Sequence, residues 1–90
     1  MFKRKKEVYV IVGLQEDPNC GNWVLCNNDH GWLSSYKKAR AELLEMLLEV
    51  QLEAKDNGYT FEYELYDNKF TGYLDDNIYI EYNIHKMIVN

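Results

Sequence analysis

The stretch Ser34–Gly58, SSYKKARAELLEMLLEVQLEAKDNG, decides the fold of this chain. Ser34 or Ser35 is suited to cap the start of a helix, because a serine hydroxyl accepts a hydrogen bond from a free backbone N–H group. The Asn57-Gly58 pair favours the left-handed backbone on which helices end. Apolar residues recur between these signals at spacings of three and four, which predicts one helix from about Tyr36 to about Asp56.

This helix carries two neighbouring apolar stripes. The first consists of Tyr36, Ala39, Leu43, Leu47, Val50 and Ala54, and the second consists of Leu44, Leu48 and Leu52. Together they are wider than the surface that one sheet face normally covers. Two explanations remain open: the helix lies deep in a groove, or its spare leucines contact another subunit.

Two strand candidates precede the helix and three follow it. A turn segment that contains Pro18, Asn19 and Gly21 separates the first two, Glu7–Leu14 and Trp23–Cys26, which predicts a hairpin. Of the last three, Tyr59–Tyr66 and Ile78–Ile84 have apolar residues mainly on one face and polar residues mainly on the other. Phe70–Leu74, between them, is short and bounded by turns. The order β-β-α-β-β-β predicts a single α+β domain over residues 1–90, an antiparallel sheet of four to five strands with one long helix on one face. Residues 1–6, MFKRKK, are interpreted as a basic tail.

The overall charge limits the classes of partner. The net charge is −5, which disfavours direct nucleic-acid binding, since phosphate contacts need Lys and Arg. The apolar run after the basic tail has seven residues and no small-residue cleavage site follows it, so we interpret it as a strand rather than a signal peptide. No stretch approaches the length needed to span a membrane. We therefore expect a cytoplasmic protein without a membrane partner.

No catalytic or metal-binding pattern stands out. Cys20, Cys26 and His30 match no compact zinc motif, and a fourth ligand would have to be the distant His85. Nothing marks either cysteine as an activated nucleophile, and the chain has no glycine-rich phosphate loop. We expect no metal, no cofactor and no enzymatic activity.

The acidic hairpins after the helix are the most specific surface feature. Glu62 and Glu64 alternate with the apolar residues of their strand, so their carboxylates lie about 6.6 Å apart on the opposite face. Tyrosines stand among the acids, which is typical of contact surfaces. The predicted partner-binding residues are Glu62, Glu64, Tyr66, Asp67, Asp75, Asp76, Tyr79 and Glu81. An alternative is that these acids only keep a small domain soluble.

A second candidate site is the polar loop that precedes the helix. Trp23 and Trp32 flank this loop, and an aromatic rim of this kind suits the capture of a ligand or partner. The candidate residues are Asn27, Asn28, Asp29, His30 and Trp32. The alternative is structural: Trp23 belongs to the core and Trp32 packs the helix start against the sheet.

In size, acidity and composition, as in Asp56–Tyr66 and Leu74–Tyr82, the chain resembles the small acidic orphan proteins of phages and mobile elements. Among these are anti-CRISPR and other anti-defence inhibitors. The resemblance implies a stoichiometric inhibitor without catalysis, acting in the host cytoplasm, and it assigns no residue a role.

Three functions follow as hypotheses. The first is an inhibitor whose acidic, tyrosine-bearing surface mimics nucleic acid and blocks a host protein with a basic surface. The second is a dimeric binder or sensor of a small, nucleotide-like ligand, with its pocket near Trp32 and the 27–31 loop. The third is a structural or assembly subunit. The spare leucines predict a homodimer, and strand pairing through Ile78–Ile84 would strengthen it if that strand lay at a sheet edge.

Overall fold

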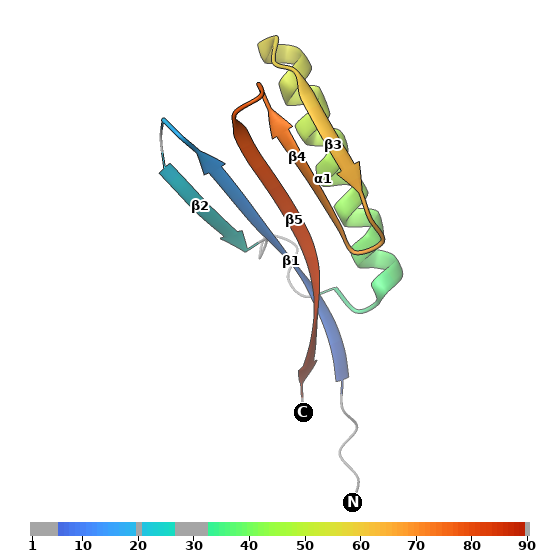
Figure 1. Cartoon of the computed structure of the whole chain (residues 1–90). Coiled ribbons are helices and arrows are strands. Elements are labelled where there is room, and N and C mark those ends of the chain that lie inside the picture. Colours follow the sequence, from blue (N-terminus) through green and yellow to red (C-terminus); the bar gives the residue numbers. More distant parts are fainter. Residues whose placement is uncertain (1–5, 20, 27–32, 90) are drawn as a thin grey trace, which may run out of the picture.

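The computed structural model of the chain describes residues 6–19, 21–26 and 33–89. It has one antiparallel sheet of five strands and one helix on one face of that sheet, which confirms the predicted α+β fold (Figure 1). In chain order the elements are β1 (Lys6–Asp17), β2 (Gly21–Cys26), α1 (Tyr36–Asn57), β3 (Phe61–Leu65), β4 (Lys69–Leu74) and β5 (Ile78–Val89).

The helix begins and ends where its local sequence predicts. The Ser35 hydroxyl accepts a hydrogen bond from the backbone N–H of Lys38 at 3.1 Å and caps the first turn. Gly58 adopts a left-handed backbone with φ of 71°, and its N–H bonds to the carbonyls of Ala54 and Lys55. The helix is one residue longer than predicted, because Asn57 still has helical geometry.

The strand order is β2-β1-β5-β4-β3, so the first strand of the chain pairs with the last. The β1–β5 ladder runs from Lys6 opposite Val89 to Glu16 opposite Tyr79. The last strand is therefore longer than predicted and central, bonded to β1 on one side and to β4 on the other. The suggestion that it lies at an edge, open to pairing with a second subunit, is wrong. The edges are β2 and β3.

The main core cluster lies between α1 and one face of the sheet. Its buried members are Ala39, Leu43 and Leu47 of the helix with Ile11, Phe70, Ile80 and Ile84 of the strands. The Phe70 and Tyr82 rings stack with their centroids 5.1 Å apart. The predicted alternation is confirmed over Ile78–Ile84 of β5, where the even-numbered residues belong to or pack against the core and the odd-numbered residues face away.

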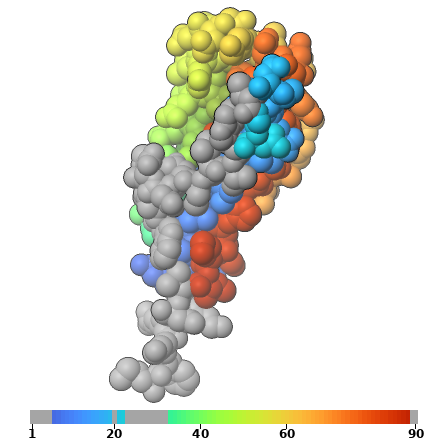
Figure 2. All heavy atoms as spheres, turned by 90° about the vertical axis from the view of Figure 1, so that its left-hand side faces the viewer, coloured from blue at the N-terminus to red at the C-terminus, as the bar shows by residue number. Residues whose placement is uncertain are grey.

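The second leucine stripe of α1 faces solvent. Leu44, Leu48 and Leu52 are 41%, 54% and 51% exposed. The helix therefore does not lie in a groove, and of the two explanations only a contact with another molecule remains as a prediction. Figure 2 shows α1, in green to yellow, on one side of the strands.

Several predictions fall outside the described residues. These are the basic tail up to Lys5, the thiol at Cys20 and the candidate loop with Asn27, Asn28, Asp29, His30 and Trp32. Lys6, the last residue assigned to the tail, is instead the first residue of β1. In the part of the chain that the structure describes, no helix is both long enough and apolar enough to cross a membrane.

Candidate partner-binding face

The face of the sheet away from α1 carries glutamates and tyrosines that the strand register brings together. Two rows cross the sheet from β3 to β1. One row contains Glu62, Tyr73, Tyr79 and Glu16, and the next contains Glu64, Thr71, Glu81 and Leu14. Directly opposed residues on neighbouring strands have side chains about 5 Å apart, so each row is continuous. We call Glu16, Glu62, Glu64, Thr71, Tyr73, Tyr79 and Glu81 the acidic face.

Four of the predicted partner-binding residues belong to this face: Glu62, Glu64, Tyr79 and Glu81. A fifth, Tyr66, follows β3 and donates its hydroxyl hydrogen bond to the Glu64 carboxylate. These five residues come from β3, the position after it and β5, which lie on either side of β4.

The three aspartates of the predicted site lie at opposite ends of the sheet. Asp75 and Asp76 form the turn between β4 and β5, where both adopt left-handed backbones with φ of 53° and 67°. Asp67 lies in the turn between β3 and β4, and its carbonyl accepts a hydrogen bond from the Tyr36 hydroxyl at the start of α1. Asp67 is therefore separated from the other two by the length of β4, so the three aspartates do not form one group.

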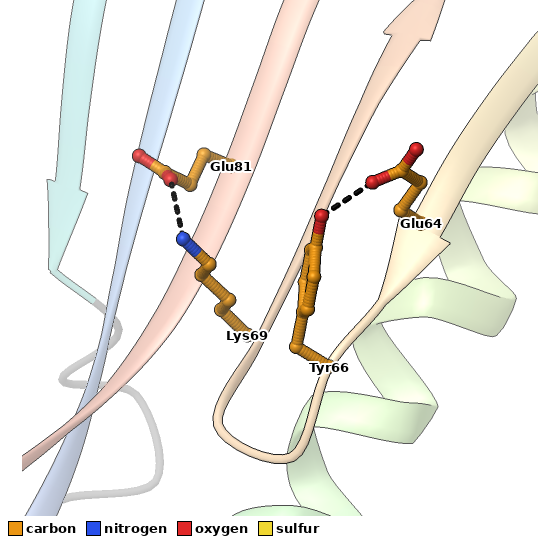
Figure 3. Close-up of polar contacts among 4 residues, drawn as sticks. All are labelled: Glu64, Tyr66, Lys69 and Glu81. Carbon is orange, nitrogen blue, oxygen red and sulfur yellow. Dashed lines mark hydrogen bonds and ion pairs between the residues drawn. The ribbon is translucent and has the colours of Figure 1, made fainter.

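A chain of polar contacts joins the strands within the acidic face (Figure 3). The Lys69 ammonium lies 3.9 Å from the Glu81 carboxylate and 5.2 Å from the centroid of the Tyr66 ring. Tyr66 in turn bonds to Glu64. These exposed contacts are individually weak. Lys69 partly neutralises the charge of Glu81, and Tyr66 restrains the Glu64 carboxylate. Among the described residues, Glu16 and Glu62 make no such contact.

Sequence reasoning missed three members of this face, Glu16, Thr71 and Tyr73. Glu16 follows the apolar run that defined the first strand, and the polar end of β1 gave no strand signal. Tyr73 is outward by simple alternation with Phe70 and Gly72, but the glycine interrupted the pattern. Tyr73 is 52% exposed, and its ring packs against that of Tyr79 with centroids 5.4 Å apart and planes tilted by 58°.

Two hollows lie on either side of Tyr73. The larger has a volume of about 620 Å³ and lies at the sheet end that carries the β1–β2 and β4–β5 turns; it is lined by Glu16, Pro18, Asn22, Tyr73, Asn77 and Tyr79. We call it the end pocket. The smaller, of about 380 Å³, lies over β3 and β4 and is lined by Glu62, Tyr63, Glu64, Thr71, Gly72 and Tyr73.

Negative charge on this face acts on its tyrosines. The pKa of Tyr79 is raised above the ordinary tyrosine value, first by partial burial and then by the Glu81 carboxylate, with smaller effects from Tyr73 and Glu16. The hydrogen bond and charge of Glu64 raise the pKa of Tyr66. The acidic face therefore opposes any further negative charge.

We expect Glu81→Gln to lower the pKa of Tyr79, and Glu16→Gln to lower it by less. The reason is that each removes a charge that opposes tyrosinate formation, and Glu81 has the larger influence. An NMR titration of the Tyr79 Cζ resonance measures the change, and Glu45→Gln on the helix is a matched control. Equal pKa values in all four proteins would contradict the arrangement of charges described here.

Tyr79 also makes the free energy of unfolding depend on pH in the alkaline range. A folded-state pKa above the unfolded one means that the stabilisation is fully present below about pH 10, the ordinary tyrosine pKa, and is lost as pH rises through the folded pKa.

Among the described residues, no group of three or more His, Cys, Asp or Glu side chains is arranged to hold a metal ion. Comparison with protein-family models, curated proteins and solved structures finds no match to this chain.

Proposed function

We propose that the chain is a non-enzymatic binding protein that uses its acidic face to cover a basic surface of a partner protein. One observation carries this proposal: the register of four strands sets Glu16, Glu62, Glu64 and Glu81 beside exposed tyrosines on a sheet face that α1 leaves open.

The chemistry of this face suits a protein partner. Tyrosine rings offer a large contact area with little loss of conformational entropy, and the hydroxyls remain available for hydrogen bonds. Carboxylates complement Lys and Arg on the partner and accelerate association. A basic surface of this kind is typical of proteins that handle nucleic acids, so an inhibitor of such a protein, as in the phage-type anti-defence proteins that the composition resembles, is the role we infer.

The test compares two triple variants that change the net charge equally. Glu62→Lys/Glu64→Lys/Glu81→Lys reverses the acidic face, and Glu45→Lys/Glu49→Lys/Glu53→Lys reverses three exposed glutamates of α1. Asp75 and Asp76 stay unchanged because their left-handed backbones disfavour lysine. Binding of a synthetic peptide rich in Arg and Lys is measured by fluorescence anisotropy, with circular dichroism as the check of folding.

We expect the face variant to bind the peptide about 10- to 100-fold more weakly, because each lost ion pair is worth about 0.5–1 kcal/mol. The helix variant should lose about threefold or less. Equal losses in the two variants would show that net charge alone attracts the peptide, and the proposal would then fail.

A second candidate, assembly into a homodimer through α1, rests on the exposed leucines Leu44, Leu48 and Leu52. These side chains are already half-buried, so a helix contact would gain roughly 1 kcal/mol from each. The six side chains of two subunits would together gain about 6 kcal/mol, which lies near the lower end of the association cost of about 4–15 kcal/mol. The homodimer is therefore the weaker proposal, and it would make the stability of the protein depend on its concentration.

A further inference from the structure

We propose that the end pocket is the specificity element of the acidic face and that it takes the guanidinium group of an arginine side chain from the partner. This inference rests on the proposed function, since it names the group that the face recognises. The pocket is lined by two tyrosines, a carboxylate, two side-chain amides and a proline.

The pocket is built by secondary structure rather than by a single loop. Tyr73 and Tyr79 come from the paired strands β4 and β5, and Glu16 comes from β1, where it pairs directly with Tyr79. A hydrogen bond stabilises the β1–β2 turn at its rim, where the Asp17 carboxylate accepts from the Asn19 N–H at 2.8 Å. Such positioning on strands favours recognition of a defined group.

The β4–β5 turn forms the other wall, and it too is anchored. The Asp75 N–H donates a 2.8 Å hydrogen bond to the Thr60 carbonyl, which joins this turn to the segment between α1 and β3. Asn77, the pocket residue of this wall, follows directly after Asp76. The two turns reach the same end of the sheet because β1 and β4 run in the same direction (Figure 1).

The described lining offers acceptors and aromatic surface but no cation. The Glu16 carboxylate and the amide oxygens of Asn22 and Asn77 accept hydrogen bonds, and the Tyr73 and Tyr79 rings lie side by side. A guanidinium has five N–H donors in one plane, remains charged at every relevant pH, pairs with a carboxylate through two hydrogen bonds and stacks on aromatic rings. Lysine has a compact ammonium that uses only the charge and part of the aromatic attraction.

The charge of the site disfavours anionic ligands, and its size suits a side chain with part of its peptide. Glu16 lines the pocket, Glu81 lies beside Tyr79 on the same strand, and the whole chain carries a net charge of −5, so an anion would be repelled. A volume of about 620 Å³ falls in the usual range for ligand sites. It exceeds what a guanidinium alone fills, which leaves room for the side-chain stem and the peptide that bears it.

The test uses three small probes: N-acetyl-arginine methylamide, the lysine analogue and the citrulline analogue, which has the shape of arginine without its charge. NMR titration follows the side-chain amides of Asn22 and Asn77 and the ring signals of Tyr73 and Tyr79. We expect saturable shifts with arginine, a dissociation constant in the millimolar range as a lone side chain allows, weaker binding of lysine by about threefold or more, and no saturable shift with citrulline.

Two variants locate the site. Glu16→Gln should weaken the arginine probe about tenfold, because a charge-assisted bidentate pair is lost. Glu45→Gln removes the same charge from the exposed side of α1, outside both the acidic face and the end pocket, and should change binding by less than about twofold. Binding of citrulline equal to arginine, or equal losses in the two variants, would overturn the assignment of the pocket.

The two proposals fail separately. If the basic peptide distinguishes the charge-reversed variants but the arginine probe gives no shifts at Asn22 and Asn77, only the pocket assignment is wrong. If the probe binds and depends on Glu16 but reversal of the acidic face leaves peptide binding unchanged, the pocket stands and the proposed function fails.

Discussion

Leu43→Ala is expected to lower the free energy of unfolding by about 3–5 kcal/mol, and Leu44→Ala by less than about 1 kcal/mol. The two leucines are neighbours in α1, but Leu43 is 0% exposed in the core and Leu44 is 41% exposed. Truncation of Leu43 removes buried apolar contacts and leaves a cavity against Ile11 and Phe70, two further members of the same core cluster. Urea unfolding followed by circular dichroism measures both changes.

A loss of this size is a large part of the total stability, which for a domain of this length is about 5–13 kcal/mol. If Leu43→Ala does not fold at ambient temperature, Leu43→Val gives a smaller change of the same sign. Equal losses for Leu43→Ala and Leu44→Ala would mean that another molecule covers the outer stripe of α1, which is the result expected of a homodimer. The open helix surface described here would then be wrong.

Gly72→Val is expected to destabilise the protein by about 3 kcal/mol and to loosen the pairing of β3. Gly72 lies on the face of β4 that is turned toward α1, and it pairs with Tyr63 of the edge strand β3. An added Cβ there would lie 2.6 Å from the Glu62 carbonyl oxygen and 2.7 Å from the Phe61 ring. The carbonyl belongs to the backbone, so it moves only if β3 shifts away from β4.

Hydrogen exchange of the β3 amides, measured with the urea unfolding curve, separates this local effect from global unfolding. The control is Thr71→Val, which introduces the same side chain one residue away on the open face of β4 without adding a Cβ. We expect it to change stability by less than about 1 kcal/mol. If the β3 amides of the Gly72→Val variant exchanged at the wild-type rates, the close approach between β3 and β4 at Gly72 would not exist in solution.

Much of the fold is local and was predictable from the sequence. The helix boundaries depend on Ser35 and Gly58, whose side chain and backbone act within one turn of their own positions. The outward positions of Glu62, Glu64 and Tyr79 depend on strand alternation, because successive side chains point to opposite faces. For these reasons the α+β architecture and the outward placement of these three side chains followed from pattern alone.

The tertiary structure decided which of these residues are neighbours. Pairing of β1 with β5 joins the two ends of the chain, and no local signal in either strand specifies that choice. It is this pairing that sets Glu16 beside Tyr79 and makes the end pocket, and it also removes β5 from the sheet edge. Asp67 and Asp75, eight positions apart in the sequence, lie at opposite ends of β4 because the chain runs one strand length between them. Sequence alone therefore determined the elements and their faces, through forces that act over a few residues. The acidic face and its pocket exist only because burial of Ile11, Phe70 and Ile84 under α1 selects one strand order.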